Sequence, residues 1–152
     1  MPRAILGTSA GVYRLDGEEA TFLGLEDERV SAVYAFSEAG RVDRILAGSY
    51  EHGLYVSDDE GGTWTRVEDG FTAPCVRWIG DDQLNQRSIL VGTEPGRIFR
   101  SSDRGSTWAE LEGIRDIPGH EDWFLPYSPR AGAVRNVYTP PGSNRYLASV
   151  EV

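Results

Sequence analysis

The sequence predicts an all-β protein built from repeated small sheets of four antiparallel strands. Turn-forming residues are abundant in the 152-residue chain, with 18 glycines and 8 prolines, whereas long apolar periods of helical spacing are few. Short apolar segments recur along the chain at near-regular steps, and a turn motif that ends in tryptophan occurs twice, one such step apart. These recurrences define the fold class.

The recurring apolar segments set the size of the repeat. They start at Ile5, Ile45, Ile89 and Tyr146, so the steps are 40 (5 to 45), 44 (45 to 89) and 57 residues (89 to 146). Steps in the forties are typical of the four-stranded blades of a β-propeller, in which small sheets are arranged radially. The third step exceeds the second by 13 residues (57 minus 44) and therefore contains an insertion.

The turn motif has the pattern S-x-D-x-G-x-T-W. Residues 57–64 read SDDEGGTW and residues 101–108 read SSDRGSTW, an offset of 44 without a gap. An earlier copy is degenerate: Thr21 and Phe22 keep a Thr–aromatic pair, but Leu15, Gly17 and Glu19 replace the Ser, Asp and Gly. The positions of interest in the two complete copies are Ser57, Asp59, Gly61, Trp64, Ser101, Asp103, Gly105 and Trp108.

This pattern resembles the Asp box, or BNR repeat, of sialidases, sortilin-type receptors, other glycoside hydrolases and photosystem II assembly factors. The resemblance implies a β-propeller, and it covers both enzymes and pure binding modules. In a tight hairpin the Asp carboxylate accepts backbone N–H bonds, Gly permits positive φ, and Trp packs between neighbouring sheets. We therefore expect Asp59, Asp103, Trp64 and Trp108 to be structural.

The repeat divides the chain into blades. We expect a partial blade at residues 4–25, complete blades at 30–68 and 74–111, an insertion at 113–132, and the start of another blade at 133–152. If the strands of a blade are named A to D from the channel outward, the B–C and D–A loops share one face, here called the top face. The A–B and C–D loops, with the Asp boxes, lie on the opposite face.

The expected strands are 4–8, 12–15 and 21–25, then 30–37, 44–50, 53–57 and 63–68, then 74–80, 88–93, 97–101 and 107–111, and finally 133–139 and 145–150. About three blades do not close a ring. We expect the chain to be part of a longer propeller of six or seven blades, and the alternative is that two copies assemble into one ring. Open edges expose unpaired strand backbone and favour association.

The insertion supplies the first candidate binding residues. It is a D–A connection and so belongs to the top face, where long irregular loops are often functional. It presents His120, Glu121, Asp122, Trp123, Tyr127 and Arg130. The alternative is that its apolar residues only cover the propeller mouth or an adjacent blade.

Other candidates share the top face. His52 and Glu94 fall in equivalent B–C loops, and Arg77 and Arg135 fall at equivalent positions of two A strands. Two guanidinium groups at the channel mouth would hold a carboxylate or phosphate, unless each is paired with an acidic neighbour. A metal site with His52 and His120 lacks any dense ligand spacing, so we predict neither a metal nor a cofactor.

Composition restricts the partners. With 15 basic and 24 acidic residues, the formal charge is −9, which argues against nucleic acid or an anionic membrane as the main partner. Cys75 is the single cysteine of the sequence and therefore cannot form an intramolecular disulfide; we expect it to be a small buried apolar residue. No signal peptide or membrane-spanning stretch is present in this sequence, so we expect a cytoplasmic protein.

The function that these features favour is a non-catalytic propeller scaffold that binds a protein, a peptide or a small acidic ligand at its top face. The alternative is a fragment of an Asp-box glycoside hydrolase. A hydrolase needs two carboxylates facing one cleft, and Glu51, Glu94, Asp116, Glu121 and Asp122 are candidates by position alone.

Overall fold

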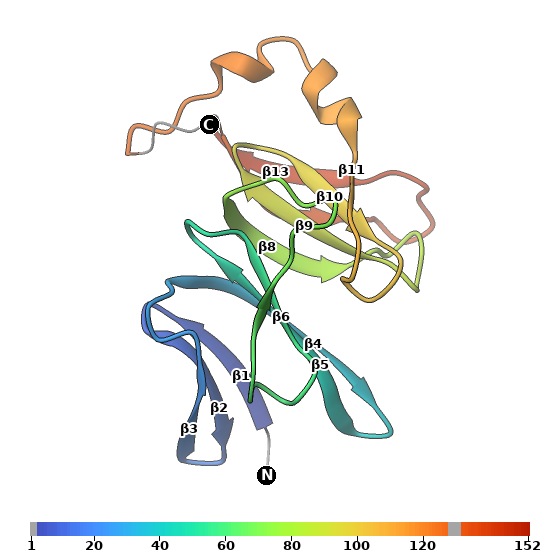
Figure 1. The fold of residues 1–152 in the computed structure, drawn as a ribbon. Coiled ribbons are helices and arrows are strands. Elements are labelled where there is room, and N and C mark those ends of the chain that lie inside the picture. The colour runs from blue at the N-terminus through green and yellow to red at the C-terminus, as the bar shows by residue number, and fades with distance from the viewer. Residues whose placement is uncertain (1–2, 128–131) are drawn as a thin grey trace.

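The computed structural model describes residues 3–127 and 132–152, and its regular structure is almost entirely β-strand. The strands form four antiparallel sheets that follow one another along an open arc (Figure 1). The first sheet holds β1 (Arg3–Thr8), β2 (Gly11–Asp16) and β3 (Glu19–Gly24). The second holds β4 (Val30–Glu38), β5 (Arg41–Ser49), β6 (Leu54–Ser57) and β7 (Thr65–Arg66).

The third sheet holds β8 (Cys75–Asp81), β9 (Ile89–Glu94), β10 (Ile98–Ser101) and β11 (Ala109–Glu110). The fourth holds β12 (Ala133–Tyr138) and β13 (Leu147–Glu151). The inner strands lie side by side, with β1 against β4, β4 against β8 and β8 against β12. The predicted all-β class and the four-stranded antiparallel units are therefore confirmed, and the described residues form part of a β-propeller without a closed ring.

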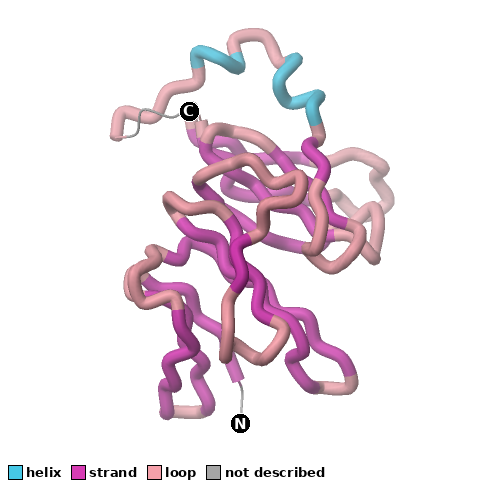
Figure 2. The backbone as a smooth tube through the Cα atoms, in the orientation of Figure 1, coloured by secondary structure: helices cyan, strands magenta, loops and turns pink. Residues whose placement is uncertain are grey.

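The differences from the predicted strands lie mainly at the sheet edges. The outer strands β7 and β11 each pair over two residues only, and the β4–β5 hairpin is longer than expected because β5 begins at Arg41 rather than at residue 44. The insertion, expected to be irregular, contains two short 3-10 helices, η1 (Glu112–Asp116) and η2 (His120–Asp122) (Figure 2). Neither these nor any other helix in the described parts of the chain has the length and apolar content to cross a membrane.

Successive sheets approach each other through a glycine–valine contact that occurs three times. At each junction between sheets, a glycine on β1, β5 or β9 lies against a valine on the first strand of the next sheet. A β-carbon placed on that glycine would lie 2.3–2.7 Å from the valine side chain. Carbon atoms in van der Waals contact need about 3.5–4.0 Å, so only glycine allows this spacing. The three pairs are Gly7 with Val30, Gly48 with Val76, and Gly92 with Val134.

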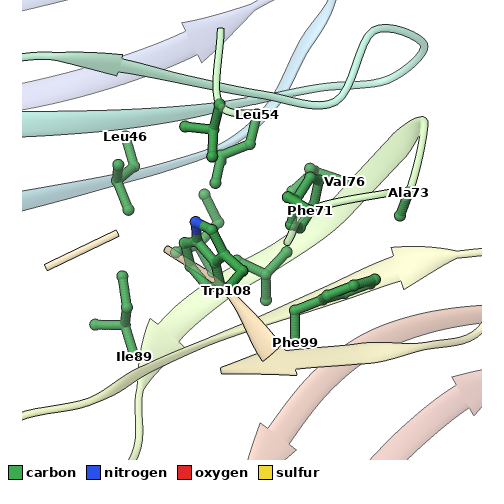
Figure 3. Packing of buried hydrophobic residues seen from close by; sticks show 11 residues of the cluster. Leu46, Leu54, Phe71, Ala73, Val76, Ile89, Phe99 and Trp108 are labelled. Carbon is green, nitrogen blue, oxygen red and sulfur yellow. The ribbon is translucent and has the colours of Figure 1, made fainter. Parts of the chain in front are cut away.

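The largest hydrophobic cluster fills the space between the second and third sheets. Leu46 and Leu54 of the second sheet meet Ile89 and Phe99 of the third (Figure 3). Phe71, in the loop that joins the two sheets, packs against Phe99 and Trp108 with ring centroids 4.8 and 5.7 Å apart. The cluster between the first and second sheets is smaller, with Val12, Val30 and Ala47 as its buried members.

The two tryptophan-ending hairpins share one hydrogen-bond pattern. In the second, the Ser101 hydroxyl donates to Asp103 Oδ1 (2.7 Å) and accepts the Gly105 N–H (2.8 Å). Asp103 also accepts the Thr107 N–H (2.9 Å) and the Thr107 hydroxyl (2.6 Å). The first hairpin makes the equivalent four bonds at 2.8 Å each, and its central glycine also has positive φ. Each Asp therefore holds its own turn closed.

The two tryptophans act differently. The Trp64 indole N–H donates to the carbonyl oxygen of Leu23 in the preceding sheet (2.7 Å), whereas the Trp108 N–H returns to Gly105 in its own hairpin (3.1 Å). Both hairpins lie on one side of the molecule, because Arg44 bonds both to Asp58 and to the Ser106 hydroxyl (2.9 Å). The β4–β5 turn lies on this same side, because Arg41 bonds to Glu60 of the first hairpin (2.9 Å).

Replacement of Gly48 by alanine tests the glycine–valine contact. The new β-carbon would lie 2.3 Å from Val76, so we expect the free energy of unfolding to fall by about 1–3 kcal/mol in urea titrations. Gly113→Ala is the control, because nothing lies within 4 Å of that position. In a double-mutant cycle, Val76→Ala should offset part of the loss. Additive effects would contradict the proposed contact.

Replacement of Asp103 by asparagine tests the hairpin as a function of pH. Burial alone would raise the pKa of Asp103, but the hydrogen bonds from Thr107, Ser101 and Ser106 outweigh it and lower the pKa to about 2. A lowered native-state pKa stabilises the fold above the ordinary value of 3.8, and this stabilisation is lost as the pH falls towards 2. The stability gap between wild type and Asp103→Asn, measured by thermal melts, should therefore narrow over that range. A constant gap would contradict this assignment.

Candidate functional site

The top face is formed by the loops opposite the tryptophan-ending hairpins. They are residues 9–10, 25–29, 50–53, 67–74, 95–97 and 111–132, of which 128–131 lie outside the described residues. Contacts between these loops confirm that they share a face: the Gly53 N–H donates to the carbonyl oxygen of Pro74 (2.7 Å), and His120 bonds to Gly96. Most of the predicted binding residues lie here, and Arg130 belongs to the part that is not described.

Arg77 and Glu94 form a buried ion pair. Arg77 lies at a β-bulge between Val76 and Trp78, which turns its side chain towards the end of β9. Its Nε and Nη2 lie 2.7 and 2.6 Å from Glu94 Oε2, and Nη2 also donates to the Tyr50 hydroxyl (2.7 Å). The two side chains are 5% and 0% exposed. Arg77 is therefore a structural partner of Glu94 and is shielded from a ligand in solvent.

Arg135 occupies the equivalent bulge of β12, between Val134 and Asn136, but it is accessible. Its Nε donates to Glu151 (2.6 Å), and the Tyr127 hydroxyl donates to the same carboxylate. Hydrogen bonds from Tyr127 and Arg135 lower the pKa of Glu151. Both side chains of the Arg135–Glu151 pair are more than a third exposed, at 39% and 38%. This pair can therefore exchange partners with a bound ligand.

His52 takes part in a group that sequence reasoning missed. Glu28, in the loop before β4, accepts hydrogen bonds from Ser49 (2.6 Å), His52 Nδ1 (3.0 Å) and Tyr55 (2.8 Å). Burial would raise the pKa of Glu28, but these three bonds lower it. Burial of the Tyr55 hydroxyl and its hydrogen bond to Glu28 raise the pKa of Tyr55 to about 12. No local pattern around Glu28 indicated these partners, because they come from the following hairpin.

His120 holds the insertion to the third sheet. Its Nε2 donates to the carbonyl oxygen of Gly96 (2.9 Å), and its ring lies 4.7 Å from the ring of Trp123. His52 and His120 thus bond to different groups, and the structure does not bring them together as a metal site. Across residues 3–127 and 132–152, no group of three or more His, Cys, Asp or Glu is arranged to hold a metal ion.

The carboxylates considered for a hydrolase do not form an obvious pair. Glu94 is fully buried beside Arg77. Glu51, Asp116, Glu121 and Asp122 are exposed, the first in a loop and the other three in the short helices η1 and η2. A cavity of about 350 Å³ lies elsewhere, between the first and second sheets, with Ile5, Val33 and Ile45 among its apolar walls and arginines at its rim. Sequence reasoning did not indicate this cavity, which lies away from the top-face loops.

The contrast between the two arginines is testable. Arg77→Met removes the hydrogen bonds that Arg77 gives to buried Glu94 and Tyr50, so we expect the free energy of unfolding to fall by about 2–4 kcal/mol. Arg135→Met, at the equivalent but exposed position, should change it far less. Urea titration of both variants makes the comparison. Equal losses would show that Arg135 is as structural as Arg77.

No family model matches the sequence, and no curated protein matches it. A solved structure of YCF48 bound to D1 peptide, a β-propeller, is similar to this chain over 96% of its residues, with a TM-score of 0.55 and 21% sequence identity. The chain spans 44% of the length of that structure. At this identity the likeness shows the fold alone, and the chain shares the architecture of part of a β-propeller.

Proposed function

We propose that this chain is a non-catalytic β-propeller scaffold whose top face binds a peptide or an extended segment of another protein. The observation that carries the proposal is the accessible Arg135–Glu151–Tyr127 group at the inner rim of that face. It offers a guanidinium, a carboxylate and an exposed aromatic ring within one bonded cluster. Such a combination suits the polar backbone and mixed side chains of a peptide.

The rest of the top face supports a rigid binding surface. Glu28 ties the loop before β4 to Ser49, His52 and Tyr55, and Arg77 ties β8 to Glu94. Because these side chains are held by one another, little conformational entropy remains to be lost when a ligand binds. The YCF48 structure, which holds a D1 peptide, supports a peptide ligand by likeness of fold.

The ligand's acidic group, where it has one, would meet Arg135 rather than Arg77. Arg77 is shielded and already neutralised by Glu94, whereas Arg135 can turn from Glu151 to a ligand carboxylate. The two arginines therefore do not form a joint anion site. His52 and His120 position loops in this proposal, and Trp123 and Tyr127 supply aromatic surface.

Within this proposal the two tryptophan-ending hairpins are Asp boxes with a structural role. The hydrogen bonds of Asp59 and Asp103 to their own turns support that role. The described strands are consistent with blades that belong to a larger ring of six or seven, and the open arc also leaves assembly of two copies as an alternative. Nothing in the geometry of the carboxylates favours the glycoside hydrolase.

Peptide binding with an Arg135 variant tests the proposal. We expect an acidic fluorescent peptide to bind the chain in anisotropy titrations, and Arg135→Ala to weaken it by about tenfold, because a charge-assisted hydrogen bond is lost. Arg145→Ala is the control, since this exposed arginine lies in the β12–β13 loop on the opposite face. Unchanged affinity in Arg135→Ala, or turnover of aryl glycosides by the chain, would overturn the proposal.

A further inference from the structure

The insertion displays apolar side chains that the fold leaves in solvent. Its described part, residues 113–127, is here called the arch, and it curves over the third and fourth sheets (Figures 1 and 2). Ile117, Phe124 and Tyr127 are 44%, 63% and 61% exposed. Single exposed hydrophobic residues are common on protein surfaces, and three within residues 117–127 make this segment a candidate interaction surface.

The exposure of Phe124 is built into the arch. Its neighbour Leu125 is buried, at 1% exposure, and Trp123 on the other side is half-buried against Gly132. The backbone is extended at Trp123, with φ −61° and ψ 122°. The side chains on both sides of Phe124 thus pack against the protein, and the Phe124 ring remains in solvent.

Two further anchors fix the arch on the third sheet. Ile114 packs against the cluster that contains Leu90, Ile98 and Val134. His120 donates to the carbonyl oxygen of Gly96, and its ring contacts that of Trp123 in a tilted arrangement. Phe124 therefore lies on a loop that is fixed to the third sheet, so that less conformational entropy is lost when a ligand binds.

Exposed acidic residues accompany Phe124 on the arch. Asp116, Glu121 and Asp122 are exposed and form no ion pair with any residue in the described ranges. The arginine of the arch, Arg115, is bound to Glu110, which raises the pKa of that guanidinium. An apolar anchor beside carboxylates that have no ion-pair partner among the described residues fits a ligand that combines an apolar side chain with basic neighbours.

We infer that the arch is a docking surface for an extended peptide segment in which arginine or lysine flanks a bulky apolar residue. The apolar residue packs on Phe124, and the basic residues face Glu121 and Asp122. This inference rests on the proposed function and names the part of the ligand that the arch recognises. It is separate from the contact at Arg135, which recognises an acidic group.

A peptide of alternating leucine and arginine is the probe, and its versions with Arg→Glu and Leu→Ser are the comparisons. We expect the chain to bind the probe, and we expect each of the two comparison peptides to bind more weakly. Phe124→Ser should weaken binding by about tenfold or more, as truncation of an aromatic anchor does. The Glu121→Gln/Asp122→Asn variant should weaken it by about three- to tenfold at low salt, with a smaller effect at high salt.

Phe22→Ser is the matched control, because Phe22 is also exposed, at 43%, but lies on the first sheet. Thermal melts of all variants check that each retains the fold. If Phe124→Ser binds the probe like the control, the arch inference is wrong, and the proposed function still stands where the acidic peptide depends on Arg135. If no peptide binds, both are wrong.

Discussion

The close approach of a glycine to a valine in the next sheet is the contact on which this arrangement depends. It repeats at every junction between described sheets, and at each junction the valine is followed directly by a β-bulge residue. The contact therefore sets the spacing of the sheets. It also marks the place on the inner strand where the β-bulge lies. The bulge residues are Ser31, Arg77 and Arg135. One packing rule thus puts three equivalent side chains at one level of the inner rim.

Equivalent positions nevertheless acquire different roles, because their surroundings differ. Ser31 bonds to carbonyl oxygens of Gly48 and Val76 and links two sheets. Arg77 is closed in by Tyr50 and Glu94, so that its charge serves the fold. Arg135 has a partner of the same chemistry in Glu151, but both remain in contact with solvent. Accessibility, rather than residue type, therefore separates the structural arginine from the one available to a ligand.

The sequence was sufficient to predict the strands and the two hairpins, because both depend on local chemistry. Apolar alternation and glycines mark the strands, and a Ser-Asp-Gly-Thr turn satisfies its own backbone donors, as Asp59 and Asp103 do. It was insufficient for contacts between units. Glu28 meets His52 only after β4 and β5 have paired, and His120 meets Gly96 from a position 24 residues further along the chain. The equivalence of Arg77 and Arg135 was predictable, but their different burial was not.

One position of the fourth sheet differs from its equivalents in the other sheets, and the candidate binding features gather beside this sheet. Ser149 pairs with Asn136 as Gly48 pairs with Ala32 and Gly92 with Trp78, so a serine holds the position that is glycine elsewhere. Ser149 carries a β-carbon, for which Gly48 and Gly92 have no room at their junctions. The arch precedes this same sheet, and Arg135 lies on its inner strand. The insertion and the accessible Arg135 thus lie together at this sheet, and the proposed peptide-binding function depends on both, because loops carried by a rigid scaffold are where binding residues concentrate.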